Sequence, residues 1–120
     1  MNASYADVAR AIRRGEWTSY GDIAAAIHGT PRAARAVGRT TATSDDFPNA
    51  HRVLRADGSI AAGSGACADR GAPVRERLEK EGVAFDRRGR AEAGARVEWD
   101  ELARRVGLEP RVVAADRRTP

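Results

Sequence analysis

The chain contains little cysteine, little lysine and no long run of apolar residues. Its single cysteine, Cys67, excludes an internal disulfide, and no cysteine and histidine residues have the spacing of zinc ligands. We therefore expect no metal and no cofactor. No stretch reaches the roughly 18 apolar residues of a membrane span. The first residues also lack a basic region followed by an apolar one, as a secretion signal requires, so we expect a cytoplasmic protein without membrane contact.

Positive charge is supplied almost wholly by arginine. Lys80 is the only lysine among 21 basic residues, and the formal net charge is +4. A basic balance favours a polyanionic partner, and arginine suits phosphates and guanine edges. A coding bias toward arginine and alanine in a GC-rich genome would raise the same count, so the placement of the arginines is more informative than their number.

Length and composition fit one folded domain. The 120 residues are 42% hydrophobic, which excludes a wholly disordered chain. We expect the domain to occupy residues 1–109. Residues 110–120 are expected to form a disordered tail, because terminal segments without an apolar pattern are rarely ordered. Nothing in the sequence suggests an oligomer, and a monomer is expected.

Three helix starts follow one another in the first third of the chain. Ser4 and Ser19 are each followed three residues later by an aspartate, which is an approximate capping box. Gly29 then marks the end of the second helix, and Pro31 occupies the first position of the third.

The third helix carries an arginine stripe. Arg32, Arg35 and Arg39 follow at i, i+3 and i+7, so they share one face. Two short helices joined by a glycine-containing turn, the second with such a stripe, indicate a helix-turn-helix. The alternative is an ordinary solvated helix, since arginine stripes are common on protein surfaces.

A small hairpin is predicted after a polar loop. Residues 40–46 lack a helical period, and residues 51–55 and 59–62 resemble two strands joined by Asp57-Gly58, a strong turn signal. Another helix should follow and end near Glu81-Gly82. The predicted fold class is mostly α with a small β-hairpin, in a winged helix-turn-helix arrangement.

Three collinear segments carry a family resemblance: Thr18-Ser19-Tyr20-Gly21-Asp22-Ile23, residues 31–39 with Ala33-Ala34-Arg35-Ala36-Val37-Gly38, and Pro48-Asn49-Ala50-His51-Arg52-Val53. Together they closely resemble the DNA-binding domain of the O6-alkylguanine-DNA alkyltransferases. In that family a Pro-Cys-His-Arg-Val segment supplies the cysteine that accepts the alkyl group. Ala50 stands at the cysteine position, and alkyl transfer requires a thiolate nucleophile. The resemblance therefore implies an alkyltransferase-like protein that is not an enzyme.

The resemblance also implies roles for single residues in DNA binding. Arg35 matches the arginine finger that fills the gap left by a flipped base, and Tyr20 matches the tyrosine that helps to rotate the base out. Arg32 and Arg39 would contact DNA beside the finger. His51 and Glu81 match the relay that activates the cysteine; without the cysteine they would be a vestigial pair.

The lesion pocket that the resemblance implies is lined by Tyr20, Ala50, Val53 and Ser64. Gly63 replaces an aromatic residue of the family, which should leave a roomier pocket. The loop before Ala50 is shorter than in active relatives, and Asn49 occupies the usual proline position. Both departures concern the conformation of this loop.

The expected function is a non-enzymatic DNA-damage sensor. It would bind O6-alkylguanine in double-stranded DNA by base flipping and mark the lesion for nucleotide excision repair proteins. A sequence-specific winged-helix transcription regulator is the alternative, and such a regulator normally needs a dimerisation surface. Alkyl transfer through Cys67 is a third option, although Cys67 lacks the His-Arg-Val context of an acceptor.

Overall fold

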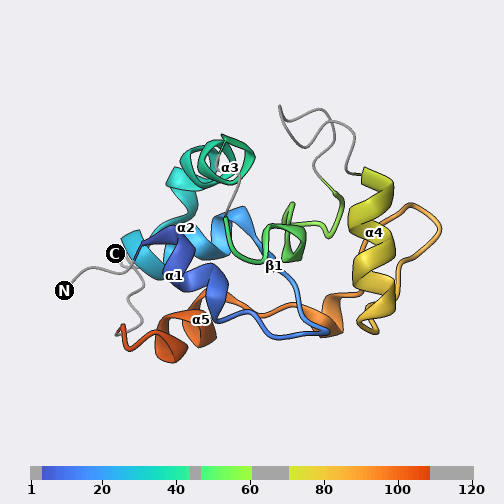
Figure 1. Cartoon of the computed structure of the whole chain (residues 1–120). Coiled ribbons are helices and arrows are strands. Elements are labelled where there is room, and N and C mark those ends of the chain that lie inside the picture. Colours follow the sequence, from blue (N-terminus) through green and yellow to red (C-terminus); the bar gives the residue numbers. More distant parts are fainter. Residues whose placement is uncertain (1–3, 44–46, 61–70, 109–120) are drawn as a thin grey trace, which may run out of the picture.

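The computed structural model describes residues 4–43, 47–60 and 71–108, and for residues 71–73 only the backbone. The described elements are the helices α1 (Tyr5–Arg10), α2 (Tyr20–His28), α3 (Ala34–Thr43), α4 (Gly71–Lys80) and α5 (Trp99–Arg105), the strands β1 (Thr18–Ser19) and β2 (Val53–Leu54), and the 3-10 turns η1 (Pro31–Ala33), η2 (Ala50–Arg52) and η4 (Ala93–Ala95) (Figure 1). This mostly helical architecture with a small sheet confirms the predicted fold class. The expected tail at 110–120 lies outside the described residues.

Both predicted capping boxes are present. The Ser19 hydroxyl accepts a bond of 2.9 Å from the backbone N–H of Asp22, and the Asp22 carboxylate accepts one of 3.2 Å from the backbone N–H of Ser19. The same reciprocal pair links Ser4 and Asp7 at the start of α1. Gly29 ends α2 with a φ of 78°, a left-handed conformation that glycine adopts without strain. The helix-turn-helix therefore follows from local sequence signals.

The third helix differs from its prediction at both ends. Its first residues, Pro31–Ala33, form a 3-10 turn rather than an α-helix, and α3 continues through Thr43 into the segment expected to be a loop. The hydroxyls of Thr40, Thr41 and Thr43 each donate to the carbonyl four residues earlier, at 2.8 to 2.9 Å. These bonds satisfy the threonines within the helix, and burial of Thr41 anchors that end of α3.

The predicted wing is only partly a hairpin. Its turn is present, because the backbone N–H of Arg55 bonds the carbonyl of Ser59 at 2.9 Å. However, β2 contains only Val53–Leu54 and pairs in parallel with β1. His51 and Arg52 lie in the turn η2 instead of a strand. Of the second predicted strand, residues 61 and 62 lie outside the described residues.

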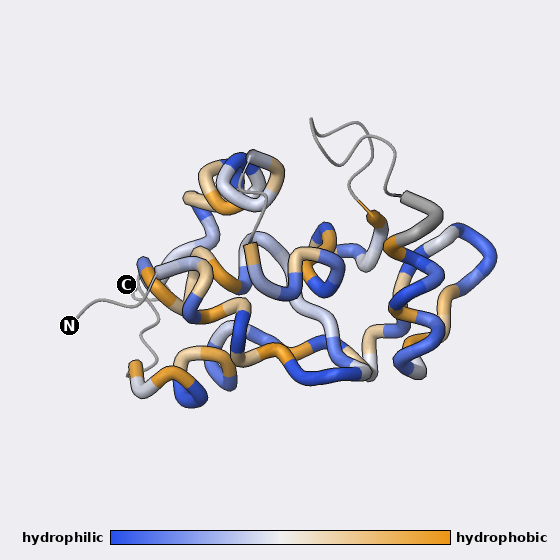
Figure 2. The backbone as a smooth tube through the Cα atoms, viewed as in Figure 1, coloured by the Kyte–Doolittle hydropathy of each residue, from blue (hydrophilic) through white to orange (hydrophobic). Residues whose placement is uncertain are grey.

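The core consists of two clusters. The larger cluster joins α1, α2, α3 and α5 through residues such as Val8, Ile23, Val37 and Leu102. The smaller cluster packs Leu54 and Trp17 against Leu78 of α4. Figure 2 shows α4 and the turn that follows it as largely hydrophilic, whereas α1 and α2 carry more hydrophobic residues. None of the described helices is long and apolar enough to cross a membrane.

The C-terminal segment completes the larger cluster. Leu102 and Ala103 of α5 are fully buried against α1 and α2. Arg96 donates from its Nε to the buried carboxylate of Asp22 at 2.9 Å, and the backbone N–H of Trp99 donates to the same side chain at 3.2 Å. Asp22 therefore both caps α2 and fixes the segment that leads into α5.

Candidate functional site

Glu81, directly after α4, binds two consecutive residues of η2. Its carboxylate accepts a hydrogen bond of 2.9 Å from the Nε2 of His51 and two of 3.0 Å from the guanidinium of Arg52. Successive side chains of a strand point to opposite faces, so a strand could not direct both residues to one carboxylate. The 3-10 conformation of Ala50–Arg52 allows both contacts, which explains why this segment is not a strand.

The protonation states of this pair follow from its surroundings. Burial alone would raise the pKa of Glu81, but the hydrogen bonds from Arg52 and His51 outweigh it and lower that pKa to about 2. Burial lowers the pKa of His51 below its usual 6.5, against the bond to Glu81, and the nearby charges of Arg77 and Arg52 lower it further. Near pH 7 Glu81 is therefore ionised and His51 is neutral. The single ring proton of His51 lies on Nε2, which donates a hydrogen bond to the Glu81 carboxylate.

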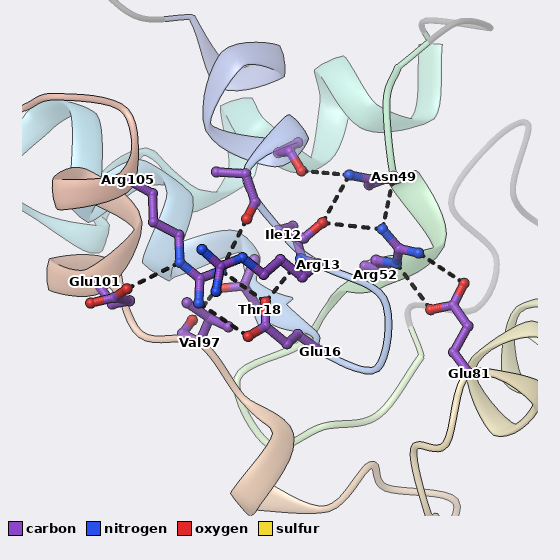
Figure 3. A network of polar contacts seen from close by, with 12 residues as sticks. Ile12, Arg13, Glu16, Thr18, Asn49, Arg52, Glu81, Val97, Glu101 and Arg105 are labelled. Carbon is purple, nitrogen blue, oxygen red and sulfur yellow. Dashed lines mark hydrogen bonds and ion pairs between the residues drawn. The ribbon is translucent and has the colours of Figure 1, made fainter.

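Asn49 fixes the other side of the segment. It has a φ of 54°, the only positive value of a non-glycine residue in the described part of the chain. Its side-chain nitrogen donates to the carbonyl of Ala9, in the last turn of α1, at 2.8 Å (Figure 3). It also donates to the carbonyl of Ile12, two residues beyond the helix, at 3.2 Å. Its side-chain oxygen accepts a bond of 3.0 Å from Arg52. The Ala9 carbonyl also accepts the backbone N–H of Ile12 at 3.1 Å, so Asn49 adds a side-chain bond to the turn that ends α1.

Sequence reasoning missed the roles of Asn49 and Arg52. Arg52 also donates to the carbonyl of Ile12 at 3.1 Å, so it links Glu81, Asn49 and the end of α1. One signal was present for Asn49, because asparagine is enriched several-fold among non-glycine residues with a positive φ. No local signal pointed to the two distant partners of Arg52, which are Glu81, 29 positions later, and Ile12, 40 positions earlier.

The predicted pocket residues occupy different depths. Val53 is buried with 3% exposure, while Ala50 is half-buried and packs against the larger core cluster. Tyr20 begins α2, is half-buried and places its ring beside Gly38 of α3, where a Cβ would lie 3.8 Å from a ring carbon. Ser64 lies outside the described residues. The structure thus connects Tyr20 to α3 and positions Ala50 at the start of η2.

The predicted DNA-binding arginines are exposed on the side of α3 away from the core. Val37 and Thr41 are the buried residues of α3, whereas Arg35 and Arg39 are offset from them by two positions, which is about 200° around a helix. Arg32 is also exposed but belongs to the preceding turn η1. The three arginines therefore remain accessible, although they do not lie on one continuous α-helix.

The site contains no residue able to act as a nucleophile at position 50. Within residues 4–43, 47–60 and 71–108, no three histidine, cysteine or acidic side chains are grouped to hold a metal ion. Cys67 lies outside the described residues. What the described side chains can do is hold the segment Asn49–Arg52 in one conformation through contacts with Ile12 and Glu81.

Residues 2–83 match the family model for the 6-O-methylguanine DNA methyltransferase DNA-binding domain, well over half of the chain. The chain belongs to this family. The predicted relationship to the O6-alkylguanine-DNA alkyltransferases is therefore confirmed.

A solved structure gives a second comparison. The crystal structure of S. pombe Atl1 in complex with damaged DNA containing O6-carboxymethylguanine is similar to this family member, with a TM-score of 0.58 and 26% sequence identity. The match covers 73% of this chain and 82% of the Atl1 chain. No curated protein sequence matches the chain at a significant level.

Proposed function

We propose that this protein is a DNA-damage sensor that binds O6-alkylguanine in duplex DNA and does not remove the alkyl group. The observation that carries the proposal is the similarity to Atl1, whose structure contains damaged DNA with O6-carboxymethylguanine. The exposed arginines of η1 and α3 support it, because a duplex is recognised through phosphates and through groups that enter the base stack. In this proposal the damaged base is rotated out of the duplex and Arg35 fills the vacated space.

Ala50 is the reason to propose binding without chemistry. Alkyl transfer needs a nucleophile whose lone pair attacks the alkyl carbon, and the methyl side chain of Ala50 has none. His51 and Glu81 also serve a structural purpose here, since Glu81 accepts three hydrogen bonds that hold η2. A retained pair next to Ala50 therefore requires no catalytic explanation.

A sensor without chemistry requires a second system to finish the repair. We propose that the bound lesion is passed to nucleotide excision repair proteins, and that the protein acts as a monomer in the cytoplasm. A test is affinity purification from cells treated with an alkylating agent, with untreated cells as the control. Absence of excision repair proteins from the lesion-dependent complexes would contradict this step.

Binding to matched duplexes tests the central proposal. Two duplexes of one sequence, with and without a single O6-methylguanine, should differ in affinity, because a weakened base pair opens at lower cost. A radiolabelled methyl group on the lesion should remain on the DNA. Equal affinity for both duplexes, with preference for one base sequence, would instead indicate a transcription regulator. Stoichiometric label on the protein would show an enzyme.

A further inference from the structure

Two hairpin turns of the same type lie side by side at one end of the molecule. In the first, the N–H of Gly58 bonds the carbonyl of Arg55 at 2.8 Å, and Gly58 has a φ of 87°. In the second, the N–H of Gly89 bonds the carbonyl of Asp86 at 3.0 Å, and Gly89 has a φ of 78°. Each is a tight turn followed by a left-handed glycine, a common three-residue hairpin loop.

The second hairpin, residues 85–91, is attached to the first. Phe85 pairs with Ala91 within it, and Arg90 pairs with Ser59 across the two. The N–H of Ala91 also donates to the carbonyl of Gly58 at 2.8 Å. A Cβ at Gly58 would lie only 2.8 Å from the carbonyl oxygen of Ala91, so glycine is needed for this approach. Residues 85–91 therefore extend the wing that begins at β2.

Two arginines occupy the tip of the second hairpin. Arg87 and Arg88 are the central residues of its turn, and both are exposed. The Asp86 carboxylate accepts bonds from the backbone N–H groups of Arg88 and Arg90, at 2.9 and 3.0 Å, which fixes the turn. Among the residues that the structure describes, no carboxylate forms an ion pair with Arg87 or Arg88, whereas Arg90 pairs with Asp86.

The base of the hairpin is held against α4. The guanidinium of Arg75 lies 5.1 Å from the centre of the Phe85 ring, while its Nε binds Glu79 at 3.3 Å. The backbone N–H of Ala84 donates to the Glu92 carboxylate at 2.8 Å, and that of Glu92 donates to the Ala84 carbonyl at 2.9 Å. The tip arginines are thus presented by a supported backbone, so less conformational freedom is lost when they bind an anion.

We propose that the hairpin 85–91 is a second DNA contact, in which Arg87 and Arg88 bind backbone phosphates of the duplex that holds the lesion. The choice of damaged DNA as the partner rests on the function proposed above. The hairpin lies outside the family-matched residues 2–83 and continues the wing, which favours the same duplex over a separate protein partner. Arginine guanidinium groups bind phosphate oxygens in two parallel hydrogen bonds, and two adjacent ones would contact neighbouring phosphates.

The position of the hairpin sets the length of DNA required. Along the long direction of the molecule, Figure 1 shows α3, then the segment around η2, then α4 and the orange hairpin. The longest dimension of the molecule is 41 Å, which is the upper limit of the span from α3 to the hairpin. This corresponds to roughly 12 base pairs at 3.4 Å per base. A duplex that ends close to the lesion on one side would engage α3 but would not reach the hairpin.

The experiment compares the Arg87→Gln/Arg88→Gln variant with the unchanged protein on plain and O6-methylguanine duplexes, over a range of salt concentrations. Loss of two phosphate contacts should reduce the slope of log K against log salt by about 2. Affinity at 0.1 M salt should fall on the order of tenfold or more, equally for both duplexes. Arg87→Lys/Arg88→Lys should keep most of the slope, and Arg104→Gln, an exposed arginine on α5, should change it little.

Duplex length gives the decisive measurement. Two shortened duplexes place the lesion close to one end or close to the other. One of them should bind the unchanged protein more weakly than the full duplex does. The Arg87→Gln/Arg88→Gln variant should show no such difference. Unchanged affinity and slope in that variant would overturn the proposal, as would a loss that no truncation reproduces. Weakened binding to an acidic partner protein with unaltered DNA binding would overturn it in favour of a protein interface. Failure of the sensor function appears separately, as equal affinity of the unchanged protein for plain and damaged duplexes.

Discussion

Arg52 and Glu81 form a two-point ion pair, in which the Nε and a terminal nitrogen of Arg52 each bind one carboxylate oxygen at 3.0 Å. Their side chains are 13% and 8% exposed, so water competes little with the pair. The same carboxylate binds His51. Arg52 also donates to the side-chain oxygen of Asn49 and to the carbonyl of Ile12, just after α1. One glutamate after α4 therefore connects the segment that contains Ala50 to two helices.

Glu81→Gln should destabilise the protein and remove part of its acid sensitivity. The pKa of Glu81 is lowered from 4.5 to about 2, so its contribution is present above pH 4.5 and is lost as pH falls toward 2. The free energy of unfolding near pH 7 should decrease by about 3 kcal/mol. Urea denaturation at several pH values measures this.

Glu79→Gln is the matched control, because Glu79 is an exposed residue of α4 that pairs with Arg75. It should change the unfolding free energy by less than about 1 kcal/mol.

The difference in unfolding free energy between the unchanged protein and Glu81→Gln should narrow as pH falls below 4.5. Because the pKa of His51 is also lowered in the folded protein, the free energy of unfolding should already decrease as pH falls below 6.5, the usual pKa of histidine. A constant difference across this range would contradict the assigned ionisation of Glu81.

Asn49→Ala should be more destabilising than Asn49→Gly. Both substitutions remove the hydrogen bonds to α1 and Arg52, but only alanine must hold a φ of 54° against its own Cβ. That conformation costs a non-glycine residue roughly 1–2 kcal/mol, so the two variants should differ by about 1 kcal/mol in unfolding free energy. Thermal and urea unfolding give this comparison. A glycine variant less stable than the alanine variant would show that residue 49 is not left-handed.

Arg35→Ala should weaken lesion binding specifically. Removing a group that fills the vacated base stack should cost on the order of 1–3 kcal/mol in lesion affinity. Arg32→Ala is the control, since a phosphate contact from η1 should weaken damaged and plain duplexes alike. A fluorescent base analogue opposite or beside the lesion reports flipping. Equal losses for both duplexes in Arg35→Ala, with the flipping signal retained, would exclude the finger role.

Ala50→Cys should keep lesion binding and transfer methyl slowly or not at all. The thiol would need to become a thiolate and to reach the alkyl carbon at roughly 3–3.5 Å. The bond from His51 Nε2 to Glu81 is the base–carboxylate half of such a relay. However, Arg52 shares the same carboxylate, and Asn49 has a positive φ at the usual proline position directly before residue 50. An error of about 1 Å can cost on the order of a hundredfold in rate. Transfer of labelled methyl to the variant measures the outcome, and a rate equal to that of an active alkyltransferase would refute the prediction.

Local chemistry in the sequence determined the helix starts and the helix-turn-helix. Ser4, Ser19 and Gly29 act through hydrogen bonds and backbone angles within a few residues, so their effect can be read without knowing the fold. The arginine face of α3 was predictable for the same reason, although the extension to Thr43 was not. The family relationship was also contained in the order of three short motifs.

The tertiary structure decided the conformation around Ala50. His51 and Arg52 leave the predicted strand because Glu81, about 30 positions later, binds both. Asn49 combines a positive φ with hydrogen bonds to the carbonyls of Ala9 and Ile12, about 40 positions earlier. The hairpin 85–91 became part of the wing only through its pairing with Gly58 and Ser59. Partners this far apart in sequence leave no periodic pattern. Their contacts exist only after the chain has folded, which is why the sequence could suggest site residues but could not show how they are held.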